Sequence, residues 1–198
     1  MSAPPDFDRL YVDETDPWLV GSSWYEERKV GVVLAALAER RYTRALDPAC
    51  GTGHLAHALA DRCDQVVACD ASVPAIEVAR TICDDATNVA LAVHTMPYGE
   101  RGPDGPFDLV VLSEVLYYLS PEDRRSAVLR VIDRAAERVE IAAVHWRDRT
   151  ENATVSGDDV HAELREFFKQ RGFRHQVAHF DEEFVLDVFT RGHDNYIA

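Results

Sequence analysis

Hydrophobic positions change their spacing from segment to segment along the chain, and these changes predict alternating strands and helices. Short, continuous apolar runs occupy residues 44–47, 65–70, 89–93, 107–113 and 139–144. Runs of this kind, rich in β-branched residues, are typical of strands that are buried on both faces of a parallel sheet. Before and between these runs, apolar residues recur at helical spacing in segments 23–40, 53–60, 72–82 and 120–138.

Polar residues indicate where several of these helices begin. Ser23 and Glu26 have the spacing of a capping box, in which the Ser23 side chain binds the Glu26 N–H and the Glu26 side chain reaches back. Ser72 is expected to cap the helix that follows it, with a proline tolerated in the first turn. Ser120 precedes another proline and is expected to begin the helix after the fourth strand.

The last third of the chain departs from strict alternation. Residues 158–171 have a helical pattern, and Gly172 occupies the position of a helix-terminating glycine. Residues 173–180 and 184–191 then form two strand-like runs with a three-residue link. So short a link cannot make a parallel crossover, which needs a dozen or more residues. The pattern therefore predicts an α/β fold in which an antiparallel hairpin closes a mostly parallel sheet.

Length, composition and charge limit the class of protein. The 198 residues fit one domain, and 46% hydrophobic with 28% charged residues is ordinary for a folded chain. A net charge of −14 argues against nucleic-acid binding and gives only weak support for a cationic substrate. No signal peptide or membrane-spanning run is recognisable. We expect one cytoplasmic domain without nucleic-acid or membrane partners, with an N-terminal segment and lid helix at 1–40 and a core at 41–198.

The strongest chemical signal lies where the first strand ends. Residues 44–53, R-A-L-D-P-A-C-G-T-G, predict a strand ending in Asp47, a turn of small residues and the start of a helix. Small residues leave backbone N–H groups and a helix N-terminus open to a polar ligand. Asp70 closes the next strand, where a carboxylate in a Rossmann-like sheet binds the hydroxyls of a ribose. The two strand ends predict an adenosine-containing cofactor.

Two other interpretations of this turn remain open. Residues 51–56 also satisfy G-x-G-x-x-A, so the motif alone does not exclude an NAD(P)-dependent oxidoreductase. Two features argue against an oxidoreductase. The carboxylate of Asp47 would repel the pyrophosphate of a dinucleotide, and the chain ends in an antiparallel hairpin. A non-catalytic protein that keeps the fold is the second alternative. No metal site is expected, because the four cysteines lack zinc-ligand spacing.

The chain resembles the class I S-adenosylmethionine-dependent methyltransferases over roughly residues 40–191. The first motif of that family, acidic-x-Gly-x-Gly-x-Gly, is matched by Asp47, Ala49, Gly51 and Gly53, with Ala49 in place of the first glycine. Residues 107–119, F-D-L-V-V-L-S-E-V-L-Y-Y-L, are similar to its fourth-strand motif. The resemblance implies S-adenosylmethionine as cofactor. It also implies a Rossmann-like three-layer αβα sandwich with seven strands, the last inserted antiparallel beside the fifth.

Within this family the chain looks like the nodulation protein S group, which N-methylates an amino-sugar unit of a chitin oligosaccharide. The shared segments are D-P-W at 16–18, S-W-Y-E-E-R-K at 23–29, S-E-V-L-Y-Y-L at 113–119 and V-H-W-R at 144–147. The resemblance implies methyl transfer to a small molecule, with a nitrogen such as an amino-sugar amine as the expected target. It is compatible with a monomer or a homodimer.

The resemblance also implies a set of cofactor-binding residues. The first-strand turn would hold the methionine end of the cofactor, Asp70 the ribose, and the residues after the third strand the adenine. The expected residues are Asp47, Ala49, Cys50, Gly51, Gly53, Asp70, Ala71, His94, Thr95, Met96, Ser113, Trp18, Trp24 and Arg28. Trp18, Trp24 and Arg28 either form a lid, with Arg28 on the cofactor carboxylate, or belong to an ordinary amphipathic helix.

Four residues are candidates for the chemistry of the acceptor. Glu114 or His145 would take a proton from a substrate amine, since an imidazole titrates near neutral pH. Tyr117 and Tyr118 would line the acceptor pocket and attract a cation with their rings. Each has a structural alternative: a surface carboxylate that caps a turn, a histidine in a structural hydrogen bond, or an aromatic ring in the core.

Overall fold

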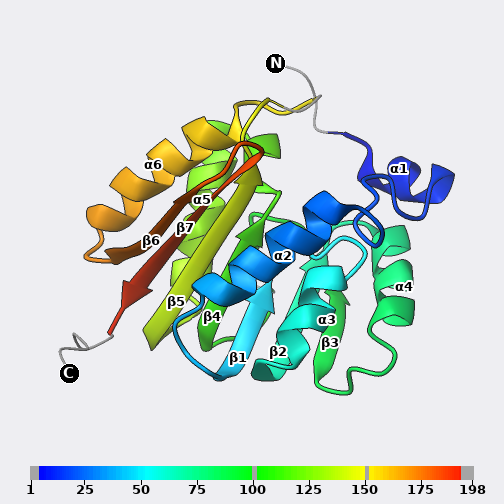
Figure 1. The fold of residues 1–198 in the computed structure, drawn as a ribbon, viewed down its shortest axis with the longest axis horizontal. Helices are drawn as coiled ribbons and strands as arrows, with labels where there is room; N and C mark the ends of the chain where they lie inside the picture. The colour runs from blue at the N-terminus through cyan, green and yellow to red at the C-terminus, as the bar shows by residue number, and fades with distance from the viewer. Residues whose placement is uncertain (1–4, 100–101, 150–151, 193–198) are drawn as a thin grey trace.

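The computed structural model describes residues 5–99, 102–149 and 152–192, which form one seven-stranded sheet with helices on both faces (Figure 1). The strands are β1 (Tyr42–Asp47), β2 (Cys63–Asp70), β3 (Val89–Val93), β4 (Phe107–Ser113), β5 (Ala135–Trp146), β6 (Arg174–Phe180) and β7 (Phe184–Arg191). The helices are α1 (Phe7–Asp13), α2 (Trp24–Ala36), α3 (His54–Ala60), α4 (Val73–Ile82), α5 (Pro121–Ile132) and α6 (Gly157–Lys169), with a 3₁₀ turn η1 (Leu116–Tyr118).

The strand order is β3-β2-β1-β4-β5-β7-β6. Strands β1 to β5 pair in parallel, whereas β7 pairs antiparallel with both β5 and β6. The predicted Rossmann-like architecture is therefore confirmed, including the strand inserted antiparallel beside the fifth. None of the helices in the described part of the chain combines the length and the apolar character that crossing a bilayer requires.

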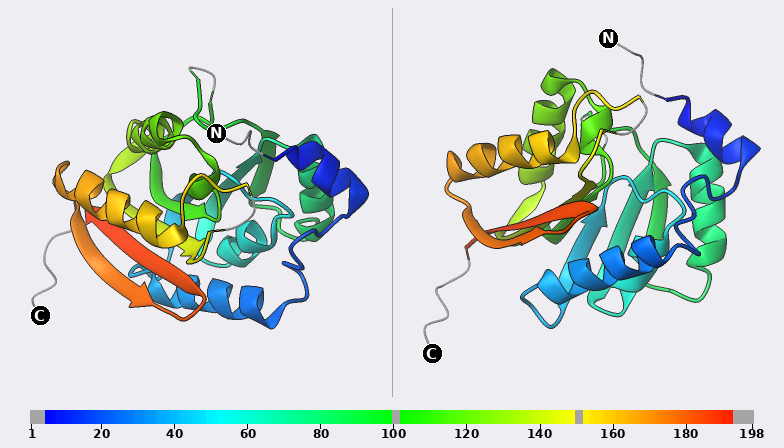
Figure 2. Two further views of the ribbon diagram at one scale, coloured as in Figure 1. Left: turned by 90° about the horizontal axis from the view of Figure 1, so that it is seen from above. Right: turned by 45° about the horizontal axis from the view of Figure 1, so that its top comes forward.

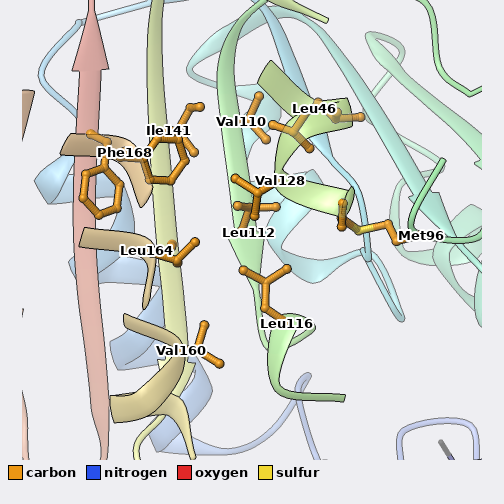
Figure 3. Close-up of a cluster of buried hydrophobic side chains, with 14 of the residues drawn as sticks. Leu46, Met96, Val110, Leu112, Leu116, Val128, Ile141, Val160, Leu164 and Phe168 are labelled. Atoms are coloured by element: carbon orange, nitrogen blue, oxygen red, sulfur yellow. The ribbon is translucent and has the colours of Figure 1, made fainter. Parts of the chain in front are cut away.

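Both faces of the sheet are buried, as the continuous apolar runs predict. On β4, Val110 and Leu112 point to one face and Leu109 and Val111 to the other. Helices α2, α3 and α4 cover the second face, and α5 and α6 cover the first. Figure 2 shows α2 and α5 on opposite sides of the sheet. Figure 3 shows the α5–α6 side, where Phe168 packs with the strand residues.

Helix ends follow the sequence in part. Ser72 and Ser120 cap α4 and α5, accepting hydrogen bonds from Ala75 N (3.3 Å) and Asp123 N (3.1 Å). The helix predicted to reach residue 138 ends at Ile132, because β5 begins soon afterwards and pairs with the start of β4. The capping box predicted at Ser23 is wrong, since the Ser23 side chain makes no capping hydrogen bond.

Candidate active site

A cavity of about 1070 Å³ lies at the carboxyl ends of β1, β2 and β4, and the last residues of these strands, Asp47, Asp70 and Ser113, line it. The sheet order reverses here, because β1 lies between β2 and β4. Open α/β sheets bind ligands at such switch points. Ligand pockets commonly measure roughly 300–1,000 Å³, so the cavity has room for a nucleoside and a small second molecule.

The β1 end of the cavity holds an unpaired buried carboxylate. Asp47 is only 1% exposed, and no described residue makes a regular hydrogen bond to either of its oxygens. Burial, with a smaller contribution from the Asp70 charge and an opposing one from the Ala49 backbone, raises the pKa of Asp47 to about 7. Because burying an unpaired charge is costly, this carboxylate is suited to a ligand that brings a hydrogen-bond donor or a cation.

Asp70 fixes the turn that follows β1. One of its carboxylate oxygens accepts a hydrogen bond from Gly51 N (2.9 Å) and the other from Ser72 N (2.9 Å). Gly51 has φ of +50°, and a Cβ atom there would lie 2.8 Å from the Tyr11 hydroxyl. A residue without a side chain is thus required where the turn meets the cavity.

Most of the residues predicted to contact a cofactor line this one cavity. They are Asp47, Ala49, Cys50, Gly51, Asp70, Ala71, His94, Thr95, Met96, Ser113 and Trp18. Gly53 is not among the lining residues, because it begins α3 and packs against α4, where a Cβ would lie 2.9 Å from Ala79 Cβ. Its positive φ of +85° explains the glycine in structural terms.

Of the three residues of the predicted lid, Trp18 lines the cavity, but the structure does not place Trp24 or Arg28 there, which corrects the prediction for these two residues. The Arg28 guanidinium pairs with Asp181 in the β6–β7 turn and lies 5.3 Å from the centre of the Phe184 ring. Trp24 is 70% exposed at the start of α2. Arg28 therefore joins α2 to the terminal hairpin, and its charge is already matched by a carboxylate of the protein.

Aromatic residues of the N-terminal segment cover the cavity instead. Tyr11 of α1 lies edge-on to Trp18 (5.5 Å between ring centres), and Phe7 lies edge-on to Tyr118 (5.3 Å). All four rings line the cavity. Figure 2 shows α1 beside α4 at this edge of the sheet, in agreement with the contacts between them.

Glu114, which directly follows β4, is the centre of a polar network that lines the same cavity. Its Oε1 accepts hydrogen bonds from Lys29 Nζ (2.7 Å) and the Tyr25 hydroxyl (3.2 Å). Its Oε2 accepts from the Tyr117 hydroxyl (2.7 Å) and Trp146 N (2.8 Å). The backbone of Glu114 has φ of +52°, an uncommon value for a residue with a side chain. Four donors hold this carboxylate in one orientation.

Helix α2 contributes a second carboxylate and a lysine to the same network. Lys29 Nζ donates to Glu26 Oε1 at 2.8 Å, and both residues are buried. Burial raises the pKa of Glu26, and Lys29 only partly offsets the rise. Burial also acts to lower the pKa of Lys29, but the charges of Glu114 and Glu26 outweigh it and leave this pKa raised. The cluster of Glu26, Lys29 and Glu114 is therefore anionic when all three are charged.

The structure does not place His145 in the cavity, which corrects its prediction as a proton acceptor. His145 is fully buried. Its Nε2 accepts from Leu116 N (3.3 Å), and its Nδ1 lies 3.1 Å from His161 Nε2. His161 Nδ1 in turn lies 2.7 Å from Asp187. Burial lowers the pKa of His145 well below its ordinary value, so the ring is a neutral, structural group.

Comparison with known proteins agrees with this geometry. The model of the methyltransferase domain family matches residues 45–138, which include Asp47, Asp70 and Glu114. Nodulation protein S of Rhizobium tropici is 30% identical over 105 residues, which are 52% of this chain and 43% of that protein. The chain thus matches less than half the length of this relative. A Pseudomonas syringae protein described as a candidate methyltransferase is 32% identical, with 85% of this chain and 100% of that chain covered and a TM-score of 0.74.

The chain belongs to the class I S-adenosylmethionine-dependent methyltransferases. Its fold is also that of the N-methyltransferase NodS from Bradyrhizobium japonicum WM9, solved in complex with S-adenosyl-L-homocysteine. The TM-score is 0.81 at 20% identity, with 96% of this chain and 100% of that chain covered. At this identity the likeness concerns the fold.

Two groups of cavity residues in this class I methyltransferase are absent from the sequence prediction. Phe7 and Tyr11 lie four residues apart, which is the spacing of one helical face, but proline and aspartate around them masked the short helix. Glu26 and Lys29 also share a helical face, yet the serine before them favoured a capping role for Glu26. Their burial depends on Glu114, which is distant in sequence.

Proposed function

We propose that this protein transfers a methyl group from S-adenosylmethionine to a nitrogen of a small polar molecule, with an amino-sugar amine as the expected acceptor. The observation that carries the proposal is that two different polar groups line one cavity. Asp47 and Asp70 line it at the ends of β1 and β2, and the anionic cluster of Glu26, Lys29 and Glu114 lines it beside the end of β4. An anionic cluster suits an acceptor that arrives as an ammonium ion. The Bradyrhizobium protein with the same fold is an N-methyltransferase, which supports the choice of nitrogen.

The residues present fit S-adenosylmethionine. The unpaired carboxylate of Asp47 suits the ammonium of the methionine part, and the turn through Gly51 leaves the backbone accessible. Asp70 accepts backbone N–H groups on both oxygens, and because a carboxylate has about four acceptor positions, one remains for a ribose hydroxyl. His94, Thr95 and Met96 line the cavity after β3, beside the expected adenine position.

Catalysis of this kind needs alignment and the exclusion of water more than acid–base strength. S-adenosylmethionine supplies a methyl group already activated on a positively charged sulfur. Holding the acceptor in line with that methyl group can lower the barrier by roughly 7–11 kcal/mol. Tyr117 and Tyr118, edge-on at 4.6 Å, form an aromatic wall at which a cation gains about 0.5–2 kcal/mol. Tyr11 and Trp18 cover the cavity and limit the entry of water.

Calorimetric titration with S-adenosylhomocysteine, NAD and NADP tests the cofactor. We expect S-adenosylhomocysteine alone to bind, and we expect Asp70→Ala to weaken its binding. Binding of a nicotinamide nucleotide without S-adenosylhomocysteine would instead favour the oxidoreductase interpretation.

Transfer of a radiolabelled methyl group onto amino sugars, small amines, phenols and carboxylates tests the acceptor. We expect product only with amines, and amino sugars are the first members of the panel. Label on phenols or carboxylates alone would overturn the choice of nitrogen. Tight cofactor binding with no labelled product from any class would favour a non-catalytic binding protein.

A further inference from the structure

Glu26 and Glu27 are neighbours on α2 with opposite environments. Glu27 is exposed, whereas Glu26 is turned inward and is only 9% exposed. Lys29, less than one helical turn further on, donates to Glu26 Oε1. Glu26 Oε2 has no hydrogen-bond partner among the described residues, and Glu26 lines the cavity. Because Glu26 Oε2 is unpaired and is not among the fully buried atoms, a ligand in the cavity can donate a hydrogen bond to it.

The other carboxylate of the cluster differs in this respect. Lys29 and Tyr25 occupy Glu114 Oε1, and Tyr117 with Trp146 N occupies Oε2. Glu114 must lose one of these donors before it can accept a proton, whereas Glu26 need not. Glu114 therefore acts as the fixed point that orients Lys29 and the two tyrosine hydroxyls.

We propose that Glu26, through Oε2, binds the ammonium group of the acceptor and removes its proton before methyl transfer, while Glu114 is a positioning residue. This assignment rests on the proposed function. One N–H bond of the ammonium breaks, its electron pair stays on nitrogen, and the proton forms an O–H bond on Glu26. The neutral nitrogen then bonds to the methyl carbon as the carbon–sulfur bond breaks with its pair on sulfur. The product leaves as a methylammonium ion, and Glu26 returns its proton to water.

The charges around Glu26 suit this role. Burial is the largest influence on the Glu26 pKa and raises it, which makes the carboxylate a stronger base than an exposed one. Lys29 on the same helix opposes the rise, while Glu114 after β4 and Asp16 before α2 add to it. An incoming ammonium ion restores the charge balance of the cluster without displacing Lys29.

The test compares Glu26→Gln with Glu27→Gln, which makes the same change of charge on the exposed side of the same helix. Calorimetry with S-adenosylhomocysteine first shows that both variants fold and bind the cofactor as the wild type does. Methyl transfer is then measured across pH with the best amine of the acceptor panel, starting with glucosamine. At pH 7 we expect kcat/KM to fall by about 100-fold in Glu26→Gln and to stay unchanged in Glu27→Gln.

The pH profile separates proton removal from a merely structural role. In the wild type, kcat/KM falls on acidification as Glu26 becomes protonated, and Glu26→Gln lacks this acidic limb. The deficit of Glu26→Gln shrinks above the pKa of the amine, because the acceptor then arrives already neutral. Glu26→Asp, which keeps a carboxylate on a shorter side chain, retains the acidic limb at a reduced rate.

Each outcome distinguishes the two proposals. Transfer to no amine overturns the proposed function and this assignment with it. Transfer to an amine at full rate and with an unchanged pH profile in Glu26→Gln overturns the assignment alone. If Glu26→Gln fails to bind S-adenosylhomocysteine, the test uses Glu26→Asp. A pH profile of kcat/KM without an acidic limb in Glu26→Asp would then contradict the proposal.

Discussion

Two buried polar networks meet near the carboxyl ends of β4 and β5, and they differ in whether a hydrogen-bonding position remains for a ligand. In the first, Glu114 accepts four hydrogen bonds, one of them from Lys29. Lys29 also donates to Glu26, which lines the cavity and has one oxygen unpaired. In the second, His145 and His161 lead to Asp187 entirely within the protein.

The histidine network is complete within the fold. Leu116 N donates to His145 Nε2, so His145 carries its proton on Nδ1 and donates to His161, which donates to Asp187. Each ring nitrogen has one partner. The comparison teaches that a buried titratable residue is a candidate for binding a ligand when its own partners leave one of its hydrogen-bonding positions free.

Removing Glu114 is expected to have the largest effect, because it leaves several donors unpaired at once. Glu114→Ala deprives Lys29 of one carboxylate and frees the Tyr117 hydroxyl and Trp146 N–H. We expect the free energy of unfolding to fall by about 3 kcal/mol and methyl transfer to be lost. Urea denaturation and the transfer assay measure both, and a stability loss below about 1 kcal/mol would contradict the network.

Removing His145 is expected to affect stability alone. His145→Ala leaves a cavity and an unpaired Leu116 N–H, which should cost about 2 kcal/mol. Since the pKa of His145 is lowered by folding, the unfolded chain binds more protons below about pH 6.5. Wild-type stability therefore falls with acidification by up to about 1.4 kcal/mol per pH unit from this group, and the variant lacks that contribution. A large loss of kcat with unchanged stability would make His145 catalytic after all.

Cofactor affinity should depend on pH through Asp47. Its pKa of about 7 lies above the value in the unfolded chain, so the folded, ligand-free protein holds a proton on Asp47 that the unfolded chain releases. This proton contributes to the free energy of unfolding at low pH, and the contribution is lost as pH rises through about 7. A ligand ammonium favours the ionised form. S-adenosylhomocysteine affinity should thus fall below pH 7, by at most about tenfold per pH unit, and Asp47→Asn should remove the dependence. Calorimetry from pH 5 to pH 8.5 measures it, and an equal pH dependence in the variant would contradict the role of Asp47.

The smallest effect is expected at Arg28. Its guanidinium pairs with Asp181 and does not line the cavity. Arg28→Ala should leave the dissociation constant of S-adenosylhomocysteine within about twofold of wild type, since Arg28 does not line the cavity. A tenfold weakening would restore Arg28 to the cofactor site.

The cofactor end was predictable from the sequence because its signals are local. Asp47, Gly51 and Asp70 owe their positions to strand ends and to a turn of small residues, and each pattern lies within a few residues. The terminal hairpin followed in the same way from its three-residue link.

The acceptor end was only half predictable. Glu114, Tyr117 and Tyr118 follow a recognisable strand, but nothing near Glu26 in the sequence shows that it meets Glu114. The residues that come together are far apart along the chain, as Lys29 and Glu114 are. His145 failed as a candidate for a related reason, because its burial depends on α6.

The position of β7 has a consequence for synthesis of the chain. β7 follows β6 in sequence but lies between β5 and β6 in the sheet. As the ribosome releases the chain from its N-terminal end, β5 emerges well before the strand that covers its edge. During that interval β5 exposes unpaired backbone groups, which are a template for pairing with another nascent molecule. Protection from misassembly is therefore needed until β7 is inserted.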